Sequence, residues 1–136
     1  MNPDSLIGAW RLKSSTVSKN GISSPSFGDP PAGQLQYTAD GRMAAFLMNP
    51  RWAKDGVNAK SEHELFFSYA GSWELNDYKV QHTIEFSSVP GRIGTVFVRT
   101  INVVSDDEIE LLTEPETTAS NNVYVSTLVW RRHAGA

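Results

Sequence analysis

Most of this chain consists of short segments in which apolar and polar residues alternate, and this pattern restricts the folds open to it. Alternation with a period of two predicts strands that are buried on one face. Eight strands are expected, over residues 8–17, 33–38, 42–48, 69–75, 79–87, 94–104, 108–113 and 122–132. Their connections are mostly short and carry turn residues, such as Asp40-Gly41 and Asn76-Asp77. Closure into a barrel would remove the exposed edges of such a sheet.

The expected fold is therefore all-β: an eight-stranded antiparallel up-and-down barrel with one short helix. The length of 136 residues fits a single domain, residues 1–136. The helix is expected over residues 58–67, where helical spacing of apolar residues is not interrupted by Gly or Pro. Residues 20–32 are rich in Gly, Ser and Pro and are expected to form a long loop. We expect this loop and the helix to cover the same open end of the barrel.

Composition excludes several classes of function. The chain has no cysteine, so disulfides and thiolate chemistry are absent. Its net charge is -3 and its longest basic run is Arg131-Arg132, which argues against nucleic-acid binding. No signal sequence or membrane-spanning run is visible, which predicts a soluble cytoplasmic protein, monomeric or homodimeric. Neither a Rossmann glycine pattern, a P-loop, a zinc motif nor a nucleophile elbow is present, so no cofactor or metal is expected.

Several blocks of the sequence resemble a known family. They are "LIGAWRL", "GQLQYTADGRMAAFLM", "YAGSWEL", the strand that contains His82, "GTVFVRTI" and "LVWRR". In this order they resemble the small lipocalin-like domain, and they cover most of the chain. The resemblance implies a barrel that holds a small hydrophobic molecule.

Gly8-Ala9-Trp10 is also similar to the Gly-x-Trp signature of true lipocalins. In those barrels an arginine of the last strand packs over the tryptophan, and the resemblance implies that Arg132 or Arg131 does so here. The chain departs from true lipocalins in being shorter, in lacking a disulfide and in lacking their second signature. The resemblance is therefore to the compact intracellular relatives of the lipocalins.

Parity along each strand predicts which side chains face the interior. The inward-facing set includes Trp10, Leu12, Leu35 and Tyr37. The strand over residues 42–48 is apolar on both faces, so parity alone does not identify its inward side chains. For that strand we favour an inward set of Ala44, Phe46 and Met48.

The hairpin around "LNDYK" places one histidine on an otherwise apolar face. If Leu75 pairs with Val80, then Trp73 lies opposite His82 and Gly71 lies opposite Ile84. If Phe86 pairs with Thr95, then His82 faces Arg99 and Ile84 faces Phe97. Both registers put His82 on the interior face between Trp73 and Arg99.

Two interpretations of His82 remain open. It could be an inert core histidine, hydrogen-bonded to Tyr37 or Tyr69. Alternatively, His82 and Arg99 line a wet cavity, because a buried guanidinium needs an acidic partner, water or a polar ligand. The second interpretation is preferred. The aromatic residues around the pair would stack on a planar ligand or simply pack together; the ligand-binding set is Trp73, Tyr69, Phe46, Met48, Phe97, Ile84 and Trp130.

Two functions follow from these residues. The first is a cofactor-independent isomerase, cyclase or dehydratase of a polyketide- or terpenoid-like compound, as in secondary metabolism. In this enzyme His82 would move protons and Arg99 would stabilise an enolate or alkoxide, and Tyr37 or Tyr69 would supply a further proton or hydrogen bond. The second is a non-catalytic carrier or sensor of a hydrophobic ligand, in which His82 and Arg99 orient a carboxylate. Of the two hypotheses, the enzyme is preferred.

Overall fold

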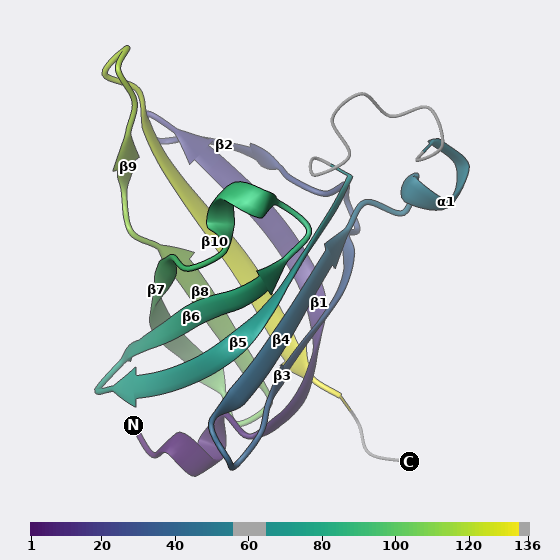
Figure 1. The fold of residues 1–136 in the computed structure, drawn as a ribbon. Coiled ribbons are helices and arrows are strands. Elements are labelled where there is room, and N and C mark those ends of the chain that lie inside the picture. The colour runs from purple at the N-terminus through teal and green to yellow at the C-terminus, as the bar shows by residue number, and fades with distance from the viewer. Residues whose placement is uncertain (56–64, 134–136) are drawn as a thin grey trace.

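The computed structural model describes residues 1–55 and 65–133. Its eight main strands form the expected closed antiparallel barrel (Figure 1). They are β1 (Gly8–Lys19), β3 (Ala32–Tyr37), β4 (Arg42–Met48), β5 (Phe66–Asn76), β6 (Lys79–Ser87), β7 (Val96–Ser105), β8 (Glu108–Thr113) and β10 (Val123–Arg132). Each pairs with the next, and the pairing of β1 with β10 closes the barrel.

Short elements add to this framework. Two brief strands, β2 (Ile22–Pro25) and β9 (Glu116–Thr117), extend the sheet beside β1 and β10. The described helix is α1 (Trp52–Asp55), and two 3-10 turns cover Pro3–Ser5 and Pro90–Arg92. No helix among the described residues is long and apolar enough to cross a membrane.

The two ends of the barrel differ in their connections. Tight hairpins join β3 to β4, β5 to β6 and β7 to β8 at the end where β1 begins and β10 ends (Figure 1). The longer connections are gathered at the opposite end, together with β2, β9 and α1. The segment over residues 20–32 contains β2, where a loop was expected, because Val17 to Lys19 of β1 continue far enough to pair with it.

Trp10 closes the end at which β1 begins and β10 ends. It is 1% exposed, its indole N–H donates to the Leu6 carbonyl at 2.9 Å, and the Arg132 guanidinium lies 4.2 Å from its ring centroid. Arg132 also donates to the carbonyls of Ile7 and Ser5, at 3.0 and 2.6 Å. The arginine that the lipocalin comparison implied is therefore Arg132.

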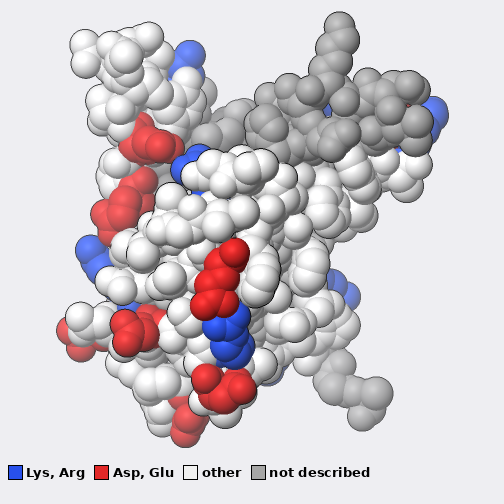
Figure 2. All heavy atoms as spheres, in the orientation of Figure 1, with Lys and Arg blue, Asp and Glu red and all other residues white. Residues whose placement is uncertain are grey.

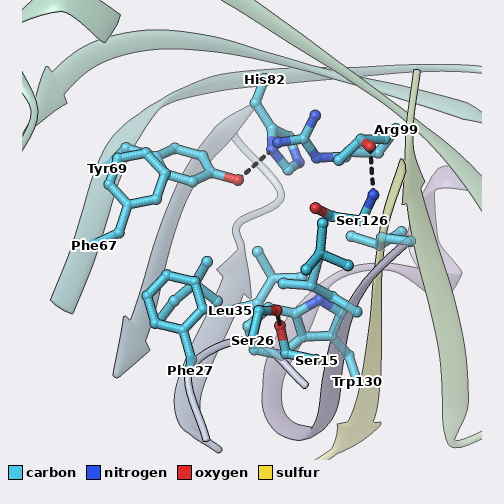
Figure 3. A pocket seen from close by; sticks show the side chains of 15 residues that line it. Ser15, Ser26, Phe27, Leu35, Phe67, Tyr69, His82, Arg99, Ser126 and Trp130 are labelled. Atoms are coloured by element: carbon cyan, nitrogen blue, oxygen red, sulfur yellow. Dashed lines mark hydrogen bonds between the residues drawn. The ribbon is translucent and has the colours of Figure 1, made fainter. Parts of the chain in front are cut away.

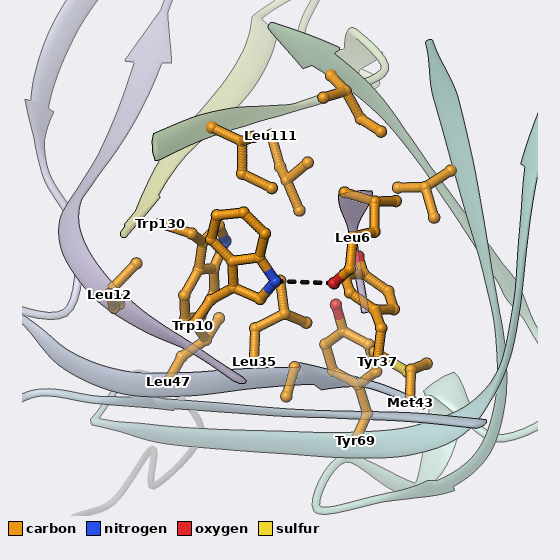
Figure 4. Close-up of a cluster of buried hydrophobic side chains, with 14 of the residues drawn as sticks. Leu6, Trp10, Leu12, Leu35, Tyr37, Met43, Leu47, Tyr69, Leu111 and Trp130 are labelled. Atoms are coloured by element: carbon orange, nitrogen blue, oxygen red, sulfur yellow. Dashed lines mark hydrogen bonds between the residues drawn. The ribbon is translucent and has the colours of Figure 1, made fainter. Parts of the chain in front are cut away.

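The core inside the barrel is built from side chains of every main strand (Figure 4). Its largest fully buried members are Trp10, Trp130, Tyr37, Leu6, Leu35, Ile84, Ile109, His82 and Val80. A small barrel of this kind leaves room for side chains or one ligand, so the position of this filling decides where a ligand fits.

The inward set predicted for β4 is wrong. Met43, Ala45 and Leu47 are buried, whereas Phe46 is 41% exposed on the outer face. The turn after β3 sets this register by pairing Leu35 with Ala45, and directly opposed residues share one face of a sheet. Because β4 is apolar on both faces, parity within the strand could not distinguish the two.

Only the last residues of the predicted helix are contradicted by the structure. Phe66 and Phe67 are the first residues of β5, and α1 lies earlier in the chain. Residues 58–64 of the predicted helix lie outside the described residues. Phe66 is instead stacked on Trp52, with ring centroids 5.6 Å apart, so an apolar aromatic pair competes here with local helix propensity.

Candidate functional site

A cavity of about 610 Å³ lies inside the barrel, next to the packed core. Most of its wall is apolar, and its polar groups lie in two places, around His82 and around Ser15 (Figure 3). The lining residues are Ser15, Val17, Ser26, Phe27, Leu35, Leu47, Phe67, Tyr69, His82, Arg99, Leu111, Thr113, Ser126, Leu128 and Trp130. A volume of this size falls within the range of small-molecule sites in proteins.

His82 is held between two tyrosines. Its Nε2 lies 2.6 Å from the Tyr37 hydroxyl and its Nδ1 lies 3.1 Å from the Tyr69 hydroxyl. The side chain is 1% exposed. Burial, and secondly the nearby charge of Arg99, lower the pKa of His82 from 6.5 to about 3. His82 is therefore a neutral imidazole near pH 7, with both ring nitrogens engaged.

The two tyrosines keep their protons at the same pH. Burial raises the pKa of Tyr37 well above its usual value and raises the pKa of Tyr69 as well. The positive charge of Arg99 opposes this effect on both phenols without reversing it. Tyr37, His82 and Tyr69 thus form a chain of neutral groups that ends at the cavity.

Arg99 is half-buried beside this chain. Its guanidinium lies 4.6 Å from the centroid of the Phe97 ring and donates to the Val98 carbonyl at 3.3 Å. Within residues 1–55 and 65–133 it forms no salt bridge. The guanidinium thus contributes a cation to the cavity wall, and no carboxylate among the described residues forms a salt bridge with it.

The two predicted registers around His82 have different outcomes. The β5–β6 register is confirmed, because Leu75 pairs with Val80 and Trp73 with His82. The β6–β7 register is shifted by two residues, so His82 lies opposite Phe97 and Arg99 lies opposite Val80. An even shift preserves the face, which is why Arg99 still lines the cavity.

Sequence reasoning missed the serine side of the cavity. Ser15 and Ser26 share a hydrogen bond of 2.7 Å, which ties the segment after β2 to the barrel wall. Trp10 and Leu12 point inward, and a bulge between Leu12 and Ser14 shifts the alternation of β1 by one residue. Ser15 therefore also points inward. The sequence gives no signal for this bulge. Phe27, which follows Ser26, lies over the same part of the cavity (Figure 3).

The structure brings together only part of the predicted ligand-binding set. Tyr69, Trp130, His82 and Arg99 line the cavity, and Tyr37 lies behind His82. Other members lie elsewhere in the barrel: Trp73 packs against Tyr37, Ile84 lies in the core, and Phe46 and Met48 do not line the cavity. Phe97 lines a second hollow.

This second hollow, of about 430 Å³, lies between the start of β7 and the segment that follows β8. It shares Phe67, Arg99, Thr113 and Ser126 with the cavity. Arg92 also lines it, with its guanidinium 5.5 Å from the Phe97 ring centroid. Arg99 therefore lies where the two spaces meet.

The described residues hold no cluster of three or more histidine, aspartate or glutamate side chains that could bind a metal ion. On the face shown in Figure 2, acidic and basic side chains are interspersed, and the basic ones form no continuous area. Arg42, for example, forms a salt bridge of 2.5 Å with Glu85.

Comparisons with known proteins identify two similar solved structures and one family. A redesigned β-barrel aligns with a TM-score of 0.46 at 13% identity, covering 96% of this chain and 94% of the other. A de novo designed fluorescence-activating β-barrel gives a TM-score of 0.46 at 14% identity, with 96% and 95% covered. No curated protein matches the sequence. The model of the lipocalin-like domain matches residues 7–133, and the chain belongs to this family.

Proposed function

We propose that this protein binds a small, largely apolar molecule inside its barrel, in the cavity between the Trp10 end and the long connections. The observation that carries the proposal is the cavity itself, which has apolar walls and polar groups at defined places. Leu35, Leu111 and Trp130 would exclude water from the ligand, and each 100 Å² of apolar surface buried gives roughly 2.5 kcal/mol before the costs of binding. Membership of the lipocalin-like family supports the same function.

Fluorescence of the uncharged probe N-phenyl-1-naphthylamine tests this proposal. We expect saturable enhancement with the wild-type protein, because the probe would leave water for an apolar cavity. Leu128→Trp should weaken this binding, since Leu128 lines the cavity and the larger ring would occupy it. Val103→Trp is the matched control, because Val103 is an exposed strand residue.

Thermal unfolding of both variants would verify that they are folded. Equal probe binding by Leu128→Trp and Val103→Trp would place the probe outside the cavity and contradict the proposal. Absence of saturable binding to the wild-type protein would contradict it as well.

A second candidate function is acid–base catalysis without a cofactor on a ketone or enol, of the polyketide- or terpenoid-like kind. The observation that favours it is the chain from Tyr37 through His82 to Tyr69, which ends beside Arg99. With both nitrogens of His82 engaged, the Tyr69 hydroxyl would meet the substrate and donate its proton to the carbonyl oxygen, while a water molecule takes the proton from the adjacent carbon. His82 would position Tyr69, and Arg99 would stabilise a developing enolate.

Deuterium exchange at the acidic carbon of a cyclic β-diketone, followed by mass spectrometry in D₂O, tests this candidate. Catalysis predicts exchange above the buffer rate with the wild-type protein, and its loss in Tyr69→Phe. Exchange at the buffer rate in both proteins would leave ligand binding as the function.

A further inference from the structure

The two distances in the hydrogen-bond chain around His82 favour one direction for it. O–H donors form shorter bonds than N–H donors, with preferred lengths of about 2.7–2.8 Å and 2.9–3.0 Å respectively. The 2.6 Å contact of Tyr37 with Nε2 fits an O–H donor, and the 3.1 Å contact of Nδ1 with Tyr69 fits an N–H donor. A neutral imidazole carries one proton, so these two assignments are compatible only if that proton is on Nδ1.

The surroundings of Tyr37 lead to the same direction. Its hydroxyl is fully buried, and its one hydrogen-bond partner among the described residues is His82. Unlike the Tyr69 hydroxyl, the Tyr37 hydroxyl does not line the cavity, so a cavity ligand or water cannot take its proton, and an unused buried donor is costly. Both observations favour Tyr37 as the donor to Nε2 and Nδ1–H as the donor to the Tyr69 oxygen.

This direction leaves the hydrogen of the Tyr69 hydroxyl available to the cavity. The oxygen of Tyr69 is occupied as an acceptor by Nδ1–H, so the group facing a ligand is an O–H donor. Arg99 adds further N–H donors and a positive charge at the same place (Figure 3). We call the Tyr69 hydroxyl and the Arg99 guanidinium the polar corner. It offers donors and a single positive charge.

We propose that the polar corner selects ligands that carry an anionic oxygen group, such as a carboxylate, on an apolar body. A carboxylate would accept hydrogen bonds from both members of the corner and neutralise Arg99. An ammonium group would face Arg99 with like charge, and an alcohol would leave Arg99 without a counter-charge. This inference rests on the proposed function and adds the chemical class of the ligand.

Acidic side chains near the second hollow do not supply that counter-charge. Glu114 and Glu116 line the hollow but not the cavity. Glu114 is bound to Lys79 at 3.3 Å, and Glu116 is exposed on β9. Arg92 also lines the hollow, so the wall of this hollow carries a second cation besides Arg99.

Three ligands with the same alkyl tail test the inference: decanoate, 1-decanol and decylamine. Each is titrated near neutral pH against the bound probe N-phenyl-1-naphthylamine. We expect decanoate to displace the probe at a concentration about tenfold lower than decanol, the lower end of what hydrogen bonds to a charged group contribute. Decylamine should be the weakest of the three.

Substitutions at the polar corner should alter this order. Arg99→Met should abolish the preference for decanoate over decanol without weakening the uncharged probe. Tyr69→Phe should lower the affinity for decanoate by about threefold to tenfold, because one donor to the carboxylate is lost. Arg11→Met controls for net charge, since Arg11 is an exposed residue of β1, and should retain the wild-type order.

The outcomes separate this inference from the proposed function. Probe binding with equal displacement by decanoate and decanol would overturn the anion preference and leave apolar binding in place. Retention of the preference in Arg99→Met would likewise overturn it, because the charge would then lie elsewhere. Failure of the probe to bind the wild-type protein would overturn both proposals.

Discussion

The guanidinium of Arg132 lies 4.2 Å from the ring centroid of Trp10 and joins the first main strand to the last. This contact closes the barrel at one end, and the hydrogen bonds of Arg132 to the Ser5 and Ile7 carbonyls hold the N-terminal segment across it. Gly8 permits the approach: its φ is +125°, and a Cβ there would lie 3.3 Å from the Arg132 Nη1.

Trp10→Ala should lower the free energy of unfolding by about 3–5 kcal/mol, the usual cost of truncating a buried large aromatic side chain. Urea denaturation followed by circular dichroism would measure it. Arg132→Met should cost less, because its stem can still cover the ring. A loss below about 1 kcal/mol for Trp10→Ala would show that this end of the barrel does not depend on the tryptophan.

Gly71→Ala should destabilise the barrel by about 3 kcal/mol or more, a size typical of backbone clashes in a closed structure. A Cβ at residue 71 would lie 1.8 Å from the Thr83 carbonyl oxygen, next to the bulge in the β5–β6 pair. Gly91→Ala is the control, since nothing lies within 4 Å of its added Cβ, and its effect should stay within about 0.5 kcal/mol. Equal stability of the two variants, measured by thermal unfolding, would contradict the β5–β6 packing.

Stability should fall as the pH falls from 6.5 towards 3, because of His82. The unfolded histidine binds a proton near pH 6.5, whereas burial and Arg99 lower the pKa of the folded one to about 3. Between these values the unfolded chain holds the extra proton, so each pH unit costs about 1.4 kcal/mol. The stabilising effect is complete above pH 6.5.

Urea denaturation between pH 6.5 and 4.5 would measure this slope. The lowered pKa values of Glu85 and Glu108 add to the slope mainly near and below pH 4.5, the usual pKa of glutamate, and comparison with a His82 variant separates the histidine from them. His82→Gln should flatten the profile. An unchanged slope in His82→Gln would show that the buried histidine is not its source.

The proton of the neutral His82 ring should reside on Nδ1. Long-range ¹H–¹⁵N spectra of the wild-type protein distinguish protonated from unprotonated ring nitrogens, and the expected pattern is Nδ1–H with a bare Nε2. Tyr37→Phe should perturb Nε2 in particular, because it removes the donor to that atom. Protonation at Nε2 would reverse the chain and leave Tyr69 without a free hydrogen for a ligand.

The strands were predictable because turn residues and alternation coincide in them. The bounds of β4, β6 and β8 agree with the predicted ranges, and the Asn76-Asp77 turn gave the correct β5–β6 register. These features depend on neighbours along the chain. Local sequence is sufficient for them.

The candidate site was less predictable because it depends on irregularities between strands. The long connection before β7 contains a 3-10 turn and shifts the β6–β7 register by two residues, and the bulge after Leu12 turns Ser15 inward. Phe46 was misassigned because both faces of β4 are apolar. The pairing of His82 with both tyrosines also needs the closed barrel, since Tyr37 comes from β3 and Tyr69 from β5.

Indole N–H signals of the four tryptophans offer the most direct test of binding inside the barrel. Trp130 lines the cavity, whereas Trp52 is stacked on Phe66 outside it. In ¹H–¹⁵N spectra recorded during a titration with decanoate, the Trp130 signal should shift progressively to saturation while the Trp52 signal stays in place. A Trp130 signal that stays fixed while decanoate binds, or a saturable shift of Trp52 alone, would contradict an interior binding site.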